Sequence, residues 1–265
     1  MTEQEQTPLP SSASQQTPDP RPVTGSRAPL ILSSLTLLLL CGALFGGYLY
    51  SNWLTQQQSE RQHQLELQLA QLHQHRLRLK DFQSVEKKIE AKRAMLPEYD
   101  PYVDGVLQAR PGTQDDVIAT VLVWHIDAGN YARALEIAEY ALASGIKPPD
   151  QYNRNLPTIV QDEVAEAILA GKLNGADALQ IAAKAMALTD QADTPDQAKS
   201  KLYKAAGWAV LGKTGSHDVD MATRTLKACK EALPLLQRAM ELDTRAGVKK
   251  DIERLERRLA KPQAK

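Results

Sequence analysis

Residues 114–142 read QDDVIATVLVWHIDAGNYARALEIAEYAL, and the fold class can be inferred from this segment. On both sides of the turn at residues 127–130, apolar residues recur every three or four positions, which is the spacing of one helix face. We predict two helices joined by a tight turn, with Thr113 and Asp116 capping the first helix. The two faces that would pack together consist of Val117, Val121, Trp124, Ala134, Leu135, Ala138 and Leu142.

The rest of the body has the same helical character. Ala, Leu, Gln, Glu and Lys are frequent, aromatic residues make up only 5% of the chain, and no run of alternating β-branched residues stands out. Pro195 fits the first turn of a helix, and Pro234 predicts a kink or break within one. We therefore predict an all-α body of stacked helical hairpins. Its further helices are expected at residues 159–170, 176–188, 196–211, 221–242 and 248–259.

The first 50 residues carry a different signal. Residues 1–28 are rich in Pro, Ser, Thr and Gln, so we predict a disordered tail. Residues 29–50 read PLILSSLTLLLLCGALFGGYLY without a charge, and about 20 apolar residues suffice to cross a bilayer as a helix. Tyr48, Tyr50 and Trp53 at one end suit the membrane interface. We predict one transmembrane helix at residues 29–50, the alternatives being a buried core helix or a cleaved signal peptide.

Residues 55–95 contain no Pro or Gly and predict one long helix. Leu65, Leu69, Leu72 and Leu79 form a short apolar seam along it, which indicates an imperfect coiled coil that pairs with another copy. Residues 56–74 are rich in Gln and could instead form a stalk or a partly ordered linker. The helix becomes basic from Arg76 onward. We expect a homo-oligomer.

Charge is unevenly distributed although the net charge of the chain is zero. Residues 100–196 hold 15 acidic and 6 basic side chains, whereas residues 197–265 hold 8 acidic and 16 basic ones. A sign asymmetry of this size indicates that the basic end binds a polyanion. The alternative is an ordinary solvated helix surface without a specific ligand.

Residues 207–214, GWAVLGKT, match the P-loop pattern GxxxxGK[ST] letter for letter. A P-loop follows a strand and opens a helix, because its backbone N–H groups must wrap around phosphates. Here the preceding residues predict a helix and the following ones a loop. We therefore expect a chance match without nucleotide binding, in which Gly212 caps a helix and Lys213 lies near its negative end. The matching residues are Gly207, Gly212, Lys213 and Thr214.

Catalytic and metal sites have no sequence signature that we could identify. His73 and His75 are two residues apart and would not share a helix face. His125 fits a packed hairpin residue better than a general base. The chain has two cysteines, Cys41 and Cys229, neither of which suggests a disulfide. We nominate no catalytic residue, no metal ligand and no cofactor.

Four blocks in fixed order give the sequence a family resemblance. They are the hairpin at residues 114–142, LPEYDPYVDGVL at residues 96–107, DTPDQAKSKLYKAAG at residues 193–207 and AGVKKDIERLER at residues 246–257. From about residue 77 onward, the chain resembles the small terminase subunit of temperate contractile-tailed phages. The resemblance implies a protein that binds double-stranded phage DNA and assembles as an oligomer. It also implies a large partner subunit that carries the packaging ATPase and the endonuclease, so that this chain is not itself catalytic.

Given that resemblance, we expect DNA to contact two basic surfaces. Lysine and arginine side chains would displace counterions from the phosphates and make the affinity sensitive to salt. The acidic residues 100–196 would serve folding, subunit contacts or docking of the large subunit. The DNA-binding residues that we predict are Arg76, Arg78, Lys80, Lys87, Lys88, Lys92, Arg93, Lys249, Lys250, Arg254, Arg257 and Arg258.

The predicted membrane helix conflicts with that role. Arg21 and Arg27 precede the apolar run, which would leave the N-terminus in the cytoplasm and the body outside it. A terminase subunit would instead need the host cytoplasm to meet DNA. A fusion with a terminase remnant in a prophage, a changed function or a reversed topology would each resolve the conflict. The alternative function is a membrane-anchored coiled-coil scaffold that binds protein.

Overall fold

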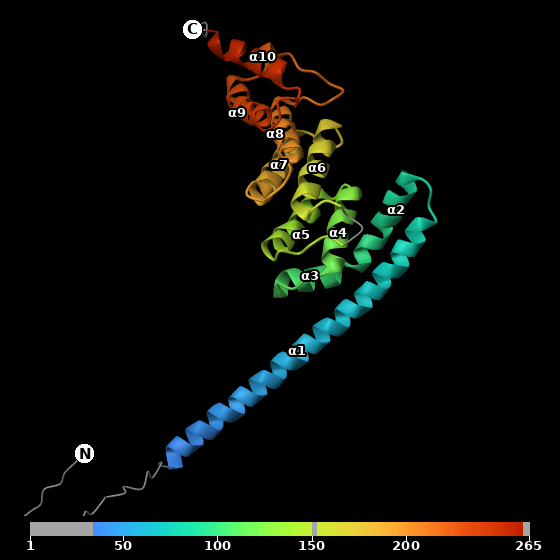
Figure 1. The fold of residues 1–265 in the computed structure, drawn as a ribbon, viewed down its shortest axis with the longest axis vertical. Coiled ribbons are helices and arrows are strands. Elements are labelled where there is room, and N and C mark those ends of the chain that lie inside the picture. Colours follow the sequence, from blue (N-terminus) through green and yellow to red (C-terminus); the bar gives the residue numbers. More distant parts are fainter. Residues whose placement is uncertain (1–33, 150–152, 262–265) are drawn as a thin grey trace, which may run out of the picture. The chain divides into compact units, whose positions relative to one another are not determined.

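The computed structural model describes residues 34–149 and 153–261, with side chains from residue 41 onward. Within these ranges the chain is all-helical, as predicted (Figure 1). The elements are α1 (Ser34–Lys80), α2 (Val85–Met95), η1 (Leu96–Glu98), α3 (Asp100–Ala109), α4 (Asp116–Asp127), α5 (Tyr131–Ala143), α6 (Leu156–Leu169), α7 (Gly175–Thr189), α8 (Asp196–Leu211), η2 (Met221–Thr223), α9 (Leu226–Leu242) and α10 (Lys249–Ala260).

The chain divides into two compact units, Met1–Thr55 and Gln56–Lys265, and α1 contributes residues to both. The disordered tail predicted at residues 1–28 lies outside the described residues, as does the start of the membrane helix predicted at residues 29–50. Among the helices that the structure describes, none is both long and apolar enough to cross a membrane. The predicted membrane span is therefore not supported. The apolar residues from Ser34 onward instead belong to a helix that continues through the Gln-rich segment to Lys80.

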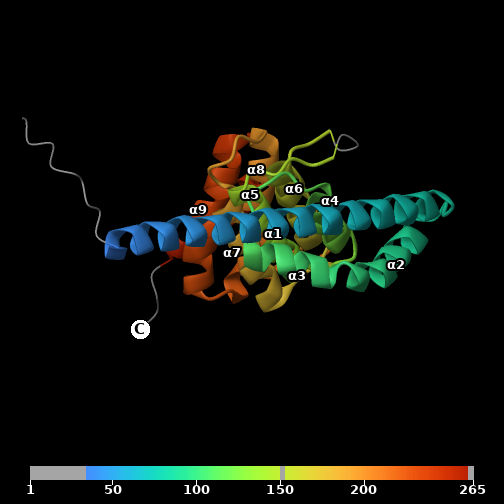
Figure 2. The same ribbon diagram turned by 90° about the horizontal axis from the view of Figure 1, so that it is seen from below.

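The prediction of a single helix at residues 55–95 is wrong in one respect, because the helix is interrupted between Lys80 and Val85. Ser84 is the N-cap of α2, and its hydroxyl accepts a hydrogen bond from the backbone N–H of Lys87. A serine in extended conformation is a favourable N-cap residue. The prediction of one helix relied on the absence of Pro and Gly and did not take this cap into account. In both views α2 returns beside the last turns of α1 (Figures 1 and 2).

The predicted coiled-coil seam packs against the body of the same chain. Leu72 is only 1% exposed and belongs to the core, and Leu65 and Leu79 are half-buried against the same core. His75 Nδ1 lies 2.8 Å from the hydroxyl of Tyr99. These contacts provide an intramolecular partner for the seam, and pairing with another copy stays a prediction.

The hairpin predicted from residues 114–142 is confirmed as α4 and α5. Every residue of α4 from Val117 to Ile126 is buried, because α4 packs against α2, η1, α5 and α6. The N-cap is Asp115 rather than Thr113, and its carboxylate accepts the backbone N–H groups of Val117 and Ile118. Asp115 satisfies two donors that the helix itself leaves unpaired.

Two hydrophobic cores meet at α8. The first core includes Leu202, Ala205, Ala206 and Ala209 of α8, and the second begins with Leu211 and extends over α9 and α10. Helices α8 and α9 approach closely at Gly207, where a Cβ atom would lie 2.5 Å from Cδ2 of Leu236. Pro234 lies inside α9 without ending it, so the break that was one of the two outcomes predicted there does not occur. A proline has no backbone N–H and therefore removes one hydrogen bond from a helix. Pro234 itself is exposed to solvent.

Replacement of Leu72 by Ala tests whether α1 is anchored to the body by this core position. We expect Leu72→Ala to lower the free energy of unfolding by about 2–5 kcal/mol, because it leaves a cavity in the core. The measurement is urea unfolding of the full chain. Leu77→Ala is the matched control: Leu77 is 42% exposed on the same helix, and its loss is expected to cost less than about 1 kcal/mol. Equal losses would contradict the packing role of Leu72.

Candidate nucleic-acid interface

The sequence of α10 places its apolar residues on one face and most of its charges on another. Ile252 and Leu255 are buried in the second core, while a stripe of basic residues recurs at intervals of three and four. The stripe lines a groove of about 550 Å³ between α10 and residues 218–222. The members of this basic stripe are Arg254, Arg257 and Arg258 of α10 and Lys261, which directly follows the helix.

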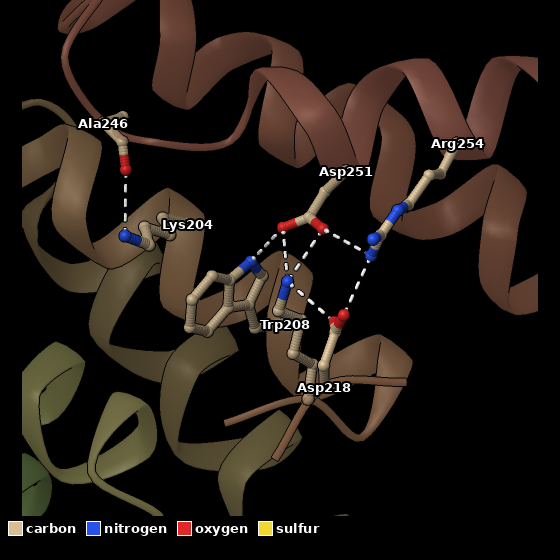
Figure 3. Close-up of polar contacts among 7 residues, drawn as sticks. Lys204, Trp208, Asp218, Ala246, Asp251 and Arg254 are labelled. Carbon is tan, nitrogen blue, oxygen red and sulfur yellow. Dashed lines mark hydrogen bonds and ion pairs between the residues drawn. The ribbon is translucent and has the colours of Figure 1, made fainter. Parts of the chain in front are cut away.

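A buried carboxylate holds α10 against α8. The side chain of Asp251 is 4% exposed, and its two oxygens lie 2.8 and 2.9 Å from Nζ of Lys213. The indole N–H of Trp208 donates to the same carboxylate at 3.0 Å (Figure 3). A buried charge must be paired and hydrogen-bonded to be tolerated, and Asp251 meets both conditions. The network therefore fixes the orientation of α10.

Asp218 joins this network from the loop opposite α10. Its carboxylate accepts a hydrogen bond from Arg254 at 2.9 Å and forms an ion pair with Lys213 at 3.1 Å (Figure 3). The guanidinium of Arg254, followed by the ammonium of Lys213, holds the pKa of Asp218 well below its usual range. Asp218 is therefore ionised at neutral pH, and part of the positive charge of Arg254 is already compensated.

Two ammonium groups flank the ring of Trp208. Nζ of Lys213 lies 4.5 Å and Nζ of Lys204 lies 4.7 Å from the ring centroid. Lys204 also donates to the backbone carbonyl of Ala246 at 2.9 Å (Figure 3). Burial lowers the pKa of Lys204 from its ordinary value. Both lysines thus contact a cation–π partner as well as an oxygen acceptor.

The P-loop match has a structural explanation. Gly207 and Gly212 lie in or directly after α8, not between a strand and a helix, and Gly212 is the C-cap in left-handed conformation with φ of 66°. That predicted cap is confirmed. Gly207 is where α8 and α9 approach, Lys213 is bound to Asp251, and Thr214 lies in the loop that follows. The absence of nucleotide binding stays a prediction.

Three of the seven basic residues predicted at the end of α1 and in α2 are engaged within the protein. Arg76 donates to the hydroxyl of Thr120 at 2.7 Å, Lys92 donates to the carboxylate of Asp127, and Nε of Arg93 donates to the carbonyl of Ala128. These contacts attach α1 and α2 to α4. Arg78, Lys80, Lys87 and Arg93 are the exposed members of this set, although Arg93 also makes the contact above, and Lys88 is half-buried.

The predicted residues of α10 separate into two groups. Lys249 and Lys250 are exposed in its first turn, whereas the predicted Arg254, Arg257 and Arg258 line the groove. Sequence reasoning missed Asp251, Trp208 and Asp218. A signal for Asp251 was available, because it is a carboxylate beside Ile252 on the apolar face of an amphipathic helix.

The described residues contain no group of three or more His, Cys, Asp or Glu side chains placed to hold a metal ion. His125 is buried in α4, and burial lowers its pKa to about 4. Its imidazole is therefore neutral at physiological pH.

Comparison with known proteins gives concordant results. Residues 69–197 match the family model described as "Phage small terminase subunit". The chain is 40% identical over 182 residues to "Terminase, endonuclease subunit" of Escherichia phage P2, and the match covers 68% of each chain. It is 26% identical over 192 residues to "Probable terminase, endonuclease subunit" of Haemophilus phage HP1, covering 67% of this chain and 64% of that protein. No solved structure matches the chain.

Lys213 contacts two carboxylates, those of Asp251 and Asp218. Substitution of each one tests which of them holds α10 against α8. Asp251→Asn leaves a shielded lysine without its buried partner, and we expect it to lower the free energy of unfolding by about 3 kcal/mol. The control, Asp218→Asn, removes a carboxylate whose side chain is 58% exposed, at an expected cost below about 1 kcal/mol. Urea unfolding monitored by circular dichroism measures both. A larger loss for Asp218→Asn would refute the anchoring role of Asp251.

Proposed function

Because the chain belongs to the phage small terminase subunit family, we propose that it binds phage DNA and recruits the large terminase subunit for packaging. The family itself suggests phage DNA packaging, and the observation that carries the proposal is the 40% identity over 182 residues to the phage P2 protein. The two steps that we add, DNA binding and recruitment, rest on the charges of the described residues and on the family role.

DNA would contact the basic residues that the fold leaves available. Arg78, Lys80 and Lys87 are exposed near the break between α1 and α2, and the basic stripe of α10 is a second source of positive charge. The internal bonds of Arg76 and Lys92 give these two a structural role. Contacts of this kind bind phosphates without reading bases, so they supply affinity and position rather than sequence preference.

The acidic residues 100–196 are our candidates for the surface on which the large subunit docks. Asp104 and Glu136 share Arg133 as an ion-pair partner, while Glu139 pairs with Lys184. Each of these carboxylates is more than half exposed and can also bind a basic partner. Oligomer formation would use surfaces other than Leu72, which the body covers.

We place the body in the host cytoplasm, where it would meet phage DNA. The alternative of a membrane-anchored scaffold depends on the span at residues 29–50, which is not supported. The family membership favours a packaging role over a scaffold.

A gel-shift titration of the full chain tests DNA recognition. The family role leads us to expect preference for phage-end DNA over unrelated DNA, and the phosphate contacts lead us to expect an affinity that falls steeply between two salt concentrations. The triple variant Arg78→Ala/Lys80→Ala/Lys87→Ala should bind about tenfold or more weakly, because three phosphate contacts are lost. Its control, Lys147→Ala/Lys172→Ala/Lys184→Ala, removes the same charge from the acidic half. If the wild-type chain binds neither DNA at low salt, the proposed DNA recognition is wrong.

The names of both relatives favour a second function, because each is called an endonuclease subunit. In our proposal the large partner carries out the cleavage, and this chain brings the DNA to it. We expect the full chain alone to leave supercoiled phage DNA intact in the presence of Mg²⁺, and cleavage to require the large subunit. Nicking assays on agarose gels measure this. Cleavage by the chain alone would assign the endonuclease step to this chain.

A further inference from the structure

We propose that the groove between α10 and residues 218–222 seats a phosphate of the DNA backbone. The inference rests on the proposed DNA-binding function and assigns one specific place to it. The groove has a volume of about 550 Å³ and lies over the second core, beyond residues 69–197 that match the family model.

The charge of the groove favours an anion. The four residues of the basic stripe, at positions 254, 257, 258 and 261, face two carboxylates, those of Asp218 and Asp220. Four cations against two carboxylates leave the groove with an excess of positive charge. Asp218 is bound to Arg254 and Lys213, and Asp220 accepts the backbone N–H of Ala222 at 2.9 Å.

The side chain of Arg258 has a hydrogen-bond donor left unpaired by the described residues, which indicates a ligand. Its Nε atom is shielded from solvent and has no hydrogen-bond partner among the described residues. A shielded N–H without an acceptor is costly, and a phosphate oxygen would supply the acceptor once the side chain of Arg258 turns into the groove. The planar guanidinium can also present two parallel N–H groups to a phosphate, which a lysine cannot do.

The surroundings hold the groove in place. Val219 and Met221, each 5% exposed, pack into the second core below the groove. On the α10 side, Asp251 is fixed by Lys213 and Trp208. A site built on such anchored elements loses little conformational entropy when it binds, which favours affinity.

Fluorescence anisotropy with the full chain and a labelled DNA duplex, at several salt concentrations, tests the proposal. The double variant Arg257→Ala/Lys261→Ala removes two exposed cations of the groove and leaves the buried network intact. We expect about tenfold weaker binding and a salt slope reduced by about 1–2. The matched control Lys227→Ala/Lys230→Ala removes two exposed charges from α9 and should change both quantities much less.

A third variant, Arg258→Lys, keeps the charge and removes the Nε donor. We expect it to bind more weakly than the wild type, with thermal unfolding showing that all variants remain folded. The proposal is overturned if the double variant behaves like its α9 control, or if Arg258→Lys binds as tightly as the wild type. Either result would still be consistent with DNA binding at another surface of the protein. Failure of the wild-type chain to bind the duplex at low salt would instead overturn the proposed function as well.

Discussion

Helix α8 packs into both hydrophobic cores and thereby joins the two halves of the body. Leu202 and its alanine neighbours complete the first core, whereas Leu211 opens the second. The helix can serve both because it is lined with small residues, and at Gly207 it admits the side chain of Leu236 from α9. Any larger residue at position 207 would force the side chain of Leu236 to shift, since interiors of proteins are close-packed and tolerate little added volume. The family model ends at residue 197, but the first core does not end there.

The fold class could be predicted because helix periodicity is a local property. The hairpin of α4 and α5 follows directly from the spacing of Val117, Val121 and Trp124. The break between α1 and α2 was missed because Ser84 acts as a cap, and nothing in the sequence says whether a serine lies within a helix or begins one. The seam through Leu72 was correctly recognised as apolar, but its partner depends on tertiary structure. Periodicity shows that a face is buried and does not show what buries it.

The candidate site was harder to predict than the fold. Counting charges identified a basic C-terminal part, yet the sequence could not separate cations used inside the protein from those available to a ligand. Arg76 and Lys92 stand in a basic run and nevertheless bind Thr120 and Asp127. Asp251 is the opposite case, because it is an acidic residue in a basic helix. Its bond to Lys213 fixes the orientation of the basic stripe. Such assignments depend on which segments fold together, and α10 is distant in sequence from α8 and from residues 218–222.

The environment of Trp208 makes the second core visible to spectroscopy. The chain has three tryptophans, and among those described only Trp208 has two ammonium groups over its ring. Positive charges near an indole shift the energy of its excited state, so the emission of Trp208 depends on the positions of Lys204 and Lys213. Because the indole N–H is bound to Asp251 of α10, movement of α10 would alter the same emission. The protein thus contains an optical reporter, placed by its own packing, for the attachment of its last helix.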